Sequence, residues 1–256
     1  MGENCHSHFK EFIHNWAKSI INFNAIKHLL PGYFKFFIDW RKYSRLPGAE
    51  SIRILNTCPR FLDQTEMTSF SPHLFFQAVW TSKKILRSGI NRHVDIASDV
   101  YFVGSLSTTV KTVFVDIRPL PVFHMENFQP IKGNILSLPF KDNFITSLSC
   151  LHVAEHIGLG RYHHHLDPYG TKKACQELSR ILAKGGNLYF SIPIGRPRLC
   201  FNSLRIYSPQ QIIEYFDELS LIELSGIDDE GIYIENINPA TLQDSEGACG
   251  LFHFIK

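Results

Sequence analysis

The chain has 256 residues, of which 44% are hydrophobic, so it can bury one sizeable core and leave a modest extension. Its six cysteines are scattered without a C-x-x-C pair, which argues against a disulfide framework and against a cysteine-based zinc site. The net charge of +2 conceals an asymmetry: residues 1–60 carry nine Lys/Arg against four Asp/Glu, net +5, so the remainder is net −3.

Residues 1–70 are predicted to form a basic, helical N-terminal extension. Apolar side chains recur there at helical spacing, namely Phe9, Ile13, Trp16 and Ile20. Pro31-Gly32 is expected to end that helix, and a second short helix is expected over 33–43. The positive charge suggests that residues 1–45 contact an anionic membrane surface or a protein partner. The alternative is that the apolar stripe covers part of the core and the lysines are solvated.

The start of the chain lacks the layout of a signal peptide, in which a positive segment precedes an apolar one and a small-residue site. No apolar run reaches the length needed to span a bilayer. We therefore expect a cytoplasmic protein, with peripheral membrane association through the basic extension as an open alternative.

Strands and helices alternate through residues 71–256. Ser71 and Pro72 provide a cap and a first helical residue, and Gly89 a stop, so 72–88 is expected to be helical. The elements expected after it are strands over 93–97, 112–117, 131–135, 146–153, 187–193, 220–226 and 250–255, with helices near 100–109, 167–184 and 208–217. This order predicts a Rossmann-like α/β domain with a seven-stranded, mostly parallel sheet and a terminal antiparallel strand.

Residues 151–162 admit two interpretations. His152, Glu155 and His156 have the inverted zinc-peptidase spacing, which would indicate a metallohydrolase. Two histidines four apart share a metal only on a helix, and in a strand they would lie roughly 13 Å apart. The preceding residues are strand-like and two glycines follow at once, so we expect no metal here. The segment is better suited to the end of a buried strand that opens into a ligand-binding loop.

Polar residues near the strand ends predict a cofactor cleft. Asp116 ends the second strand, where a carboxylate can accept both hydroxyls of an adenosine ribose. The turn after the first strand lets backbone amides approach a ligand, and Gly133-Asn134 ends the third strand, where it can hydrogen-bond an adenine edge. An aspartate at the end of a strand is also suited to a structural role, in which its carboxylate caps a turn. The predicted cofactor-binding residues are Asp95, Ala97, Ser98, Asp99, Asp116, Ile117, Asn134 and Ile135.

Five short motifs follow one another over roughly residues 90–226: Asp95-Ile-Ala-Ser-Asp99, Asp116, Leu138-Pro-Phe-Lys-Asp142, Glu155-His156 and Arg180-Ile-Leu-Ala-Lys-Gly185-Gly186. In this order they resemble the motifs of class I S-adenosylmethionine-dependent methyltransferases. A narrower set is Asp116-Ile-Arg-Pro119, Glu155-His-Ile-Gly-Leu-Gly-Arg-Tyr162 and Asp167-Pro-Tyr-Gly170. It is similar to the uncharacterised, methyltransferase-like family called domain of unknown function 268. The resemblance implies S-adenosylmethionine as cofactor and a methyltransferase-type sheet.

The chain departs from the superfamily pattern at three places, one of which is His163-His164-His165, where a small residue and an acid are expected. The first loop of the superfamily is rich in glycine, whereas Ala97-Ser98-Asp99 is followed by glycine only at Gly104. The Cβ of Ala97 restricts the backbone and narrows the room for a methionine moiety. Asn134 stands where an acidic residue is usual, which exchanges an anionic acceptor for a neutral amide.

The predicted catalytic residues are His156, Glu155, Arg161 and Tyr162. Methyl transfer is an in-line displacement, so much of its catalysis comes from positioning. For a hydroxyl acceptor, His156 or His152 has a suitable pKa for a general base, and Glu155 would orient the imidazole or hold the cofactor. Arg161 and Tyr162 suit an anionic or sugar-like acceptor.

Simpler structural roles are also open for two of these side chains. His152 is suited to a hydrogen-bonded position on a buried strand, and Arg161 to an ion pair with Asp167 that pins the loop.

The sequence therefore predicts an S-adenosylmethionine-dependent methyltransferase that acts on a small-molecule or glycan-type acceptor. The alternatives are a catalytically inactive methyltransferase-like scaffold and, third, a zinc-dependent hydrolase that uses the 152–156 motif. We expect no nucleic-acid partner, because the chain has no Asn-Pro-Pro-Tyr-like motif and no basic-aromatic stripe in its core.

Overall fold

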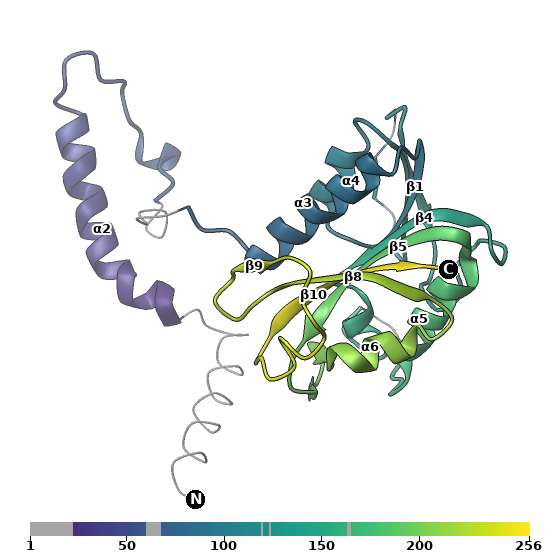
Figure 1. Cartoon of the computed structure of the whole chain (residues 1–256). Coiled ribbons are helices and arrows are strands. Elements are labelled where there is room, and N and C mark those ends of the chain that lie inside the picture. The colour runs from purple at the N-terminus through teal and green to yellow at the C-terminus, as the bar shows by residue number, and fades with distance from the viewer. Residues whose placement is uncertain (1–22, 60–67, 119, 123, 163–164) are drawn as a thin grey trace, which may run out of the picture. The chain divides into compact units, whose positions relative to one another are not determined.

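The computed structural model describes residues 23–59, 68–118, 120–122, 124–162 and 165–256 (Figure 1). The chain divides into two compact units, Met1–Ser69 and Phe70–Lys256. The helix expected over residues 9–20 lies outside the described residues. Within the described parts, no helix combines the length and the apolar character that crossing a membrane requires.

The first unit contains a long helix, α2 (Phe23–Tyr43), and a short 3-10 helix, η1 (Ile54–Asn56). The expected break at Pro31-Gly32 is wrong, because α2 runs through Pro31. An internal proline removes one helical hydrogen bond and crowds the preceding turn, but it does not have to end a helix. Beyond it, an ion pair between Lys35 and Asp39 at 3.3 Å supports the helix, as do ring contacts among Phe36, Phe37 and Trp40.

The second unit contains an eight-stranded sheet in the order β3-β2-β1-β4-β5-β10-β8-β9. Its strands are β1 (Arg92–Ile96), β2 (Lys111–Asp116), β3 (Phe128–Lys132), β4 (Ile145–Leu151), β5 (Leu182–Ile194), β8 (Ser220–Ile227), β9 (Tyr233–Ile234) and β10 (Ala248–Ile255). The first five strands pair in parallel, whereas β10 runs antiparallel to both neighbours. The predicted mostly parallel sheet is confirmed, with the two-residue β9 as an additional edge strand.

Helices cover both faces of this sheet. They are α3 (Pro72–Arg87), α4 (Val100–Leu106), α5 (Gly170–Ile181) and α6 (Pro209–Tyr215). Figure 1 shows α3 and α4 on one face and α5 and α6 on the other. Each face has its own apolar cluster: Trp80 and Phe102 belong to one, and Leu178 and Phe216 to the other. The sheet is therefore buried on both sides, as the predicted crossovers require.

Strand β3 begins earlier than the strand expected over 131–135. Pro130 lies inside it, and a proline is tolerated there because β3 is an edge strand that can lack one ladder donor. As a consequence Gly133 and Asn134 lie in the turn after the strand. A hairpin that the sequence did not reveal, β6 (Arg198–Cys200) with β7 (Leu204–Ile206), lies between β5 and α6.

Candidate functional site

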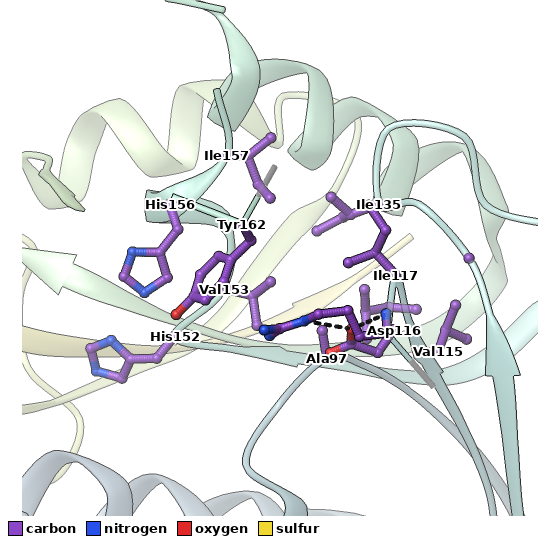
Figure 2. Close-up of a pocket in the computed structure, with 13 residues that line it drawn as sticks. Ala97, Val115, Asp116, Ile117, Ile135, His152, Val153, His156, Ile157 and Tyr162 are labelled. Atoms are coloured by element: carbon purple, nitrogen blue, oxygen red, sulfur yellow. Dashed lines mark hydrogen bonds and ion pairs between the residues drawn. The ribbon is translucent and has the colours of Figure 1, made fainter. Parts of the chain in front are cut away.

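A cavity opens where β1, β2 and β4 end, which is the edge at which open α/β sheets bind ligands (Figure 2). It is lined by Ile96, Ala97, Val115, Asp116, Ile117, Arg118, Gly133, Ile135, His152, Val153, His156, Ile157 and Tyr162. A second cavity adjoins it and shares Ala97, Asp116, Arg118 and His152. The two together form a cleft along the carboxyl ends of the strands.

The chemical character of the first cavity changes along its length. Figure 2 shows Ala97, Asp116 and Ile117 at one end and His152, His156 and Tyr162 at the other. One end therefore offers a carboxylate beside aliphatic walls. The other offers two imidazoles and a phenol.

The turn after β1 takes a backbone conformation that favours glycine. Ala97 has a φ of +54°, and its N–H donates to the carbonyl of Val115 at 2.9 Å. For a residue with a Cβ this left-handed conformation costs about 1 kcal/mol. The side chain of Ala97 lines both cavities, so the missing glycine is replaced by a strained alanine at the cleft wall.

Asp95, a predicted cofactor residue, lines neither cavity and is fully buried beneath this turn. One carboxylate oxygen accepts the N–H of Ser98 at 3.0 Å, and the other accepts the hydroxyl of Ser149. Burial raises the pKa of Asp95 to about 6. The structure thus gives Asp95 a supporting position under the turn.

The same buried network continues to His93. Its Nε2 lies 2.8 Å from Oγ of Ser149, and its Nδ1 lies 2.8 Å from Oγ of Ser147. Because Ser149 gives its only proton to Asp95, Nε2 of His93 must be the protonated nitrogen and Nδ1 accepts from Ser147. Burial lowers the pKa of His93 to about 3, so the ring is neutral.

Two other predicted cofactor residues hold backbone N–H groups near the cleft. Asp99 caps α4, since its Oδ1 accepts the N–H groups of Tyr101 and Phe102 at 2.9 and 3.2 Å. Oδ1 of Asn134 accepts the N–H of Leu136 at 3.0 Å, which makes an Asx turn. Asp99 and Ser98, a further predicted residue on the turn, line the second cavity, whereas Asn134 lines neither cavity.

Asp116 stands at the end of β2 and lines both cavities, as the sequence predicted for a ligand carboxylate. Its Oδ1 accepts the backbone N–H of Arg118 at 2.6 Å. Gly133 allows the next strand to end close by, because a Cβ there would meet Cγ1 of Val115 at 2.4 Å. Ile117 and Ile135 provide the aliphatic walls beside the carboxylate.

Sequence reasoning missed Arg118 as a site residue. Its guanidinium lies 4.8 Å from the ring centroid of Tyr162, and that of Arg161 lies 5.0 Å from the same ring. The loop after β2 therefore meets the loop after β4 across the cleft. The signal was present in the chain, since Arg118 is the third residue of the Asp116-Ile-Arg-Pro motif.

Glu155 is fully buried beside His152 and His156, the two histidines that have the inverted zinc-peptidase spacing. Its Oε1 lies 2.7 Å from Nδ1 of His152 and 3.7 Å from Nε2 of His156. Burial opposes protonation of His152, but the neighbouring Cys249 and Glu155 outweigh it and hold the pKa of His152 well above its usual range. Glu155 thus faces the imidazoles and lies behind the cavity wall.

His156 lines the cavity, and its ring is held by the backbone. Its Nδ1 lies 2.6 Å from the carbonyl oxygen of Ser203, so that nitrogen donates and Nε2 carries the lone pair. Nη1 of Arg161 lies 3.3 Å from Nδ1 and 3.4 Å from the same carbonyl. Burial and the guanidinium of Arg161 lower the pKa of His156, which keeps the ring neutral at neutral pH.

The suggested ion pair between Arg161 and Asp167 is wrong. Asp167 instead pairs with Lys173 at 2.7 Å, while Arg161 lies against His156. Arg161 is therefore directed to the predicted catalytic imidazole.

The loop after β4 is pinned by Arg205 of β7, a residue that the sequence did not single out. This buried guanidinium donates to the carbonyls of Ile157 at 2.6 Å and Asp167 at 3.1 Å. Gly158 permits the closure, because a Cβ there would meet the Asp167 carbonyl oxygen at 2.1 Å. The two ends of the loop are thus held together beneath Tyr162 and His156.

The zinc-peptidase arrangement does not form. The 3-10 helix η2 spans only Ala154–His156, so His152 and His156 share no helix face. Among the described residues, the ligand atoms of His152, Glu155 and His156 do not gather as one metal set. His152 belongs instead to a different cluster, with His73 and Cys249.

Solved structures of methyltransferases share this fold. The N-methyltransferase NodS from Bradyrhizobium japonicum, in complex with S-adenosyl-L-homocysteine, has 16% identity and a TM-score of 0.51, covering 77% of this chain and 91% of its own. A putative sarcosine dimethylglycine methyltransferase from Galdieria sulphuraria has 12% identity and a TM-score of 0.52, covering 71% and 86%. The [4+2]-cyclase SpnF has 12% identity and a TM-score of 0.51, covering 70% and 80%.

A family model described as Caenorhabditis protein of unknown function, DUF268, matches residues 129–237. A search of curated protein sequences finds no match. The predicted resemblance to the DUF268 family is thus confirmed over residues 129–237, and the solved structures confirm the predicted methyltransferase-type fold. At these identities the solved structures establish the fold, and the cyclase shows that the fold is not tied to one named reaction.

Proposed function

We propose that the chain is an S-adenosylmethionine-dependent methyltransferase that acts on a small-molecule or glycan-type acceptor. The observation that carries the proposal is the cleft itself, with Asp116 at one end and His156 at the other. It lies at the edge of the sheet where this fold binds ligands, and one neighbour of the same fold is a methyltransferase with S-adenosyl-L-homocysteine bound.

The residues at the Asp116 end fit a nucleoside. The carboxylate of Asp116 would accept the ribose hydroxyls, and Ile117 and Ile135 would flank the adenine with aliphatic surface. The N-terminus of α4 and the turn at Ala97 would face the amino-acid part of the cofactor. S-adenosylmethionine, when bound, supplies a methyl group activated on a sulfonium.

The residues at the other end fit an acceptor hydroxyl. Nε2 of His156 would take the proton of that hydroxyl, with the ring held by its bond to the Ser203 carbonyl. Arg161 would offer a guanidinium to an anionic group, and the ring of Tyr162 would pack on a sugar face. Glu155 would keep the imidazole of His152 oriented.

Calorimetric titration of the full chain with S-adenosylmethionine tests the proposal. Saturable binding is expected, and Asp116→Ala is expected to weaken it at least about tenfold, the loss of roughly 1.4 kcal/mol or more. Asp217→Ala is the matched control, because this exposed carboxylate lies outside the cleft, and its affinity should equal that of the wild type. No binding at millimolar ligand overturns the proposal.

A second candidate is a methyltransferase-like scaffold without catalysis. The strained Ala97 and the contact of Arg118 with Tyr162 across the cleft favour it, because both reduce the room for a cofactor. The two candidates are distinguished with radiolabelled S-adenosylmethionine and a metabolite extract. If label is transferred and the variant His156→Gln transfers none, the scaffold candidate is excluded. If the cofactor binds but no fraction of the extract takes up label, the scaffold candidate is supported.

We also propose that residues 1–45 contact an anionic membrane surface or a protein partner. Support comes from the net positive charge of this segment and from exposed aromatic side chains on α2, Phe34 and Phe37. Co-sedimentation of the full chain with anionic vesicles should exceed that with neutral vesicles and fall in high salt. Equal recovery with both vesicle types would exclude the membrane alternative.

A further inference from the structure

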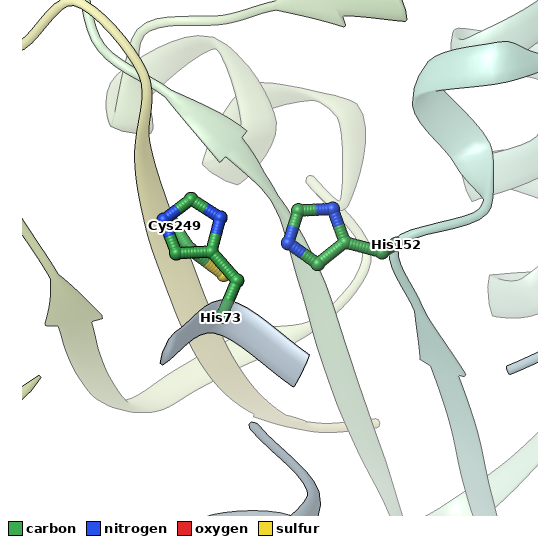
Figure 3. Close-up of side chains that lie close together, drawn as sticks. All are labelled: His73, His152 and Cys249. Carbon is green, nitrogen blue, oxygen red and sulfur yellow. The ribbon is translucent and has the colours of Figure 1, made fainter. Parts of the chain in front are cut away.

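We propose that His73, His152 and Cys249 form a binding site for a zinc-class metal ion. Each of the three offers one ligand atom, and these atoms all lie within 4.8 Å of one another. Figure 3 shows the two imidazoles and the thiol facing the same space. The site is separate from the inverted zinc-peptidase motif, with which it shares only His152.

Three segments that are distant in sequence bring these ligands together. His73 is the second residue of α3, His152 follows β4 directly, and Cys249 lies on β10. The imidazole rings of His73 and His152 stack at 9°, with 5.5 Å between their centroids. All three elements pack within one unit of the fold, so the cluster is held by the core of the sheet.

The donor set selects the class of metal. Two imidazole nitrogens and one thiolate sulfur suit zinc and similar borderline ions, whereas magnesium and calcium prefer oxygen ligands. Three protein ligands also leave the fourth position of a tetrahedral zinc ion for water or a ligand.

An unpartnered atom points independently to a ligand. Nε2 of His152 is buried and has no hydrogen-bond partner among the described residues. Nδ1 of the same ring is bonded to the buried carboxylate of Glu155 at 2.7 Å. This is the arrangement in which a carboxylate fixes one nitrogen of a histidine while the other binds a metal.

The backbone at His152 fits the same interpretation. Its φ of +55° is unusual for a residue with a Cβ, and such strain persists where the surrounding structure holds a side chain in place for a function. His152 lines both cavities of the cleft, so an ion on Nε2 would lie at the cleft wall. The inference does not rest on the proposed methyltransferase activity, and its test uses no cofactor.

The test is a titration of the chelator-treated full chain with Co²⁺, followed by displacement with Zn²⁺. One equivalent of Co²⁺ is expected to give a thiolate-to-cobalt band in the near ultraviolet, and Zn²⁺ should remove it. Cys249→Ser should abolish the band, and His73→Ala should weaken binding at least about tenfold. The matched control is Cys200→Ser, because Cys200 is an exposed cysteine of β6 and its loss should leave the titration unchanged.

Two further measurements keep the test decisive. Because Cys249 is buried, Cys249→Ser is compared with the wild type only when the circular dichroism spectra of the two proteins match. If Cys249→Ser does not fold, the result for His73→Ala decides whether the site exists, because His73 is only half-buried. Glu155→Gln should retain the thiolate band while binding falls about 10–100-fold, as for a positioning residue. Absence of a thiolate band in the wild type, or unchanged binding in His73→Ala, overturns the site.

Discussion

Nδ1 of His152 lies 2.7 Å from Oε1 of the buried Glu155, and this pair joins the cleft to the His73–Cys249 cluster. The imidazole faces the cluster through one nitrogen and the carboxylate through the other. Glu155 in turn lies 3.7 Å from His156. A single buried carboxylate thus holds the imidazole of His152 and lies beside that of His156.

Glu155→Ala is expected to lower the free energy of unfolding by roughly 3–5 kcal/mol, because it leaves one member of a buried pair without its partner. Urea denaturation followed by circular dichroism measures the change. Glu246→Ala, which removes an exposed carboxylate paired with Arg196 and Arg198, should cost much less. Equal losses in the two variants would contradict the buried pairing.

Asp95→Asn is expected to change the pH dependence of stability. The folded-state pKa of Asp95 is about 6, above its usual 3.8, so the folded chain binds the extra proton and stability falls as pH rises from about 4 to 6. The asparagine variant loses this pH-dependent contribution, so its loss of stability relative to the wild type should be about 2 kcal/mol larger at pH 4 than at pH 7.

His93 contributes in the opposite direction, since its pKa of about 3 means that stability is lost as pH falls below 6.5. Comparing Asp95→Asn with the wild type at the same pH separates the contribution of Asp95 from that of His93, because both proteins contain His93. Denaturation at pH 4, 5, 6 and 7 is the measurement, with the exposed Asp244→Asn as control. A deficit of Asp95→Asn that is constant across this range would refute the buried titration.

Ala97→Gly is expected to raise the affinity for S-adenosyl-L-homocysteine several-fold, because it removes a Cβ from the cleft wall. Stability should change little, since the relief of a left-handed alanine offsets the entropy of glycine in the unfolded chain. Calorimetry and thermal unfolding measure the two effects. Gly104→Ala in α4, where an added Cβ meets nothing within 4 Å, should leave the affinity unchanged.

Arg205→Ala is expected to loosen the loop after β4, because the carbonyls of Ile157 and Asp167 lose their donor. We expect stability to fall by about 1–3 kcal/mol and trypsin to cleave faster at Arg161. Mass spectrometry of timed digests reports the site. Arg198→Ala, at an exposed position of β6, should digest like the wild type; an unchanged rate at Arg161 in Arg205→Ala would disprove the pinning role.

Much of the fold follows from local signals in the chain. Ser71, Pro72 and Gly89 bound α3 as predicted, and the alternation of strands and helices gave the parallel sheet with its antiparallel strand. Local signals were wrong where a single residue was given too much weight. Pro31, which was expected to end a helix, lies inside α2.

The candidate site was less accessible to the sequence because its key relationships are between distant segments. The position of Asp95 depends on Ser149 of the neighbouring strand, and the pinning of the loop depends on Arg205 of a hairpin with no clear pattern. His73, His152 and Cys249 have no shared spacing that a motif could reveal. The position of Asp116 at the cleft could be predicted, because it depends only on the place where β2 ends.

The most direct measurement of the central claim is a crystal structure of the full chain soaked with S-adenosyl-L-homocysteine. The account predicts ribose hydroxyls on the carboxylate of Asp116 and the sulfur directed to the end of the cavity that holds His156 and Tyr162. A cleft that remains closed by Arg118 and Tyr162 with no ligand density, or a ligand bound away from Asp116, would contradict it.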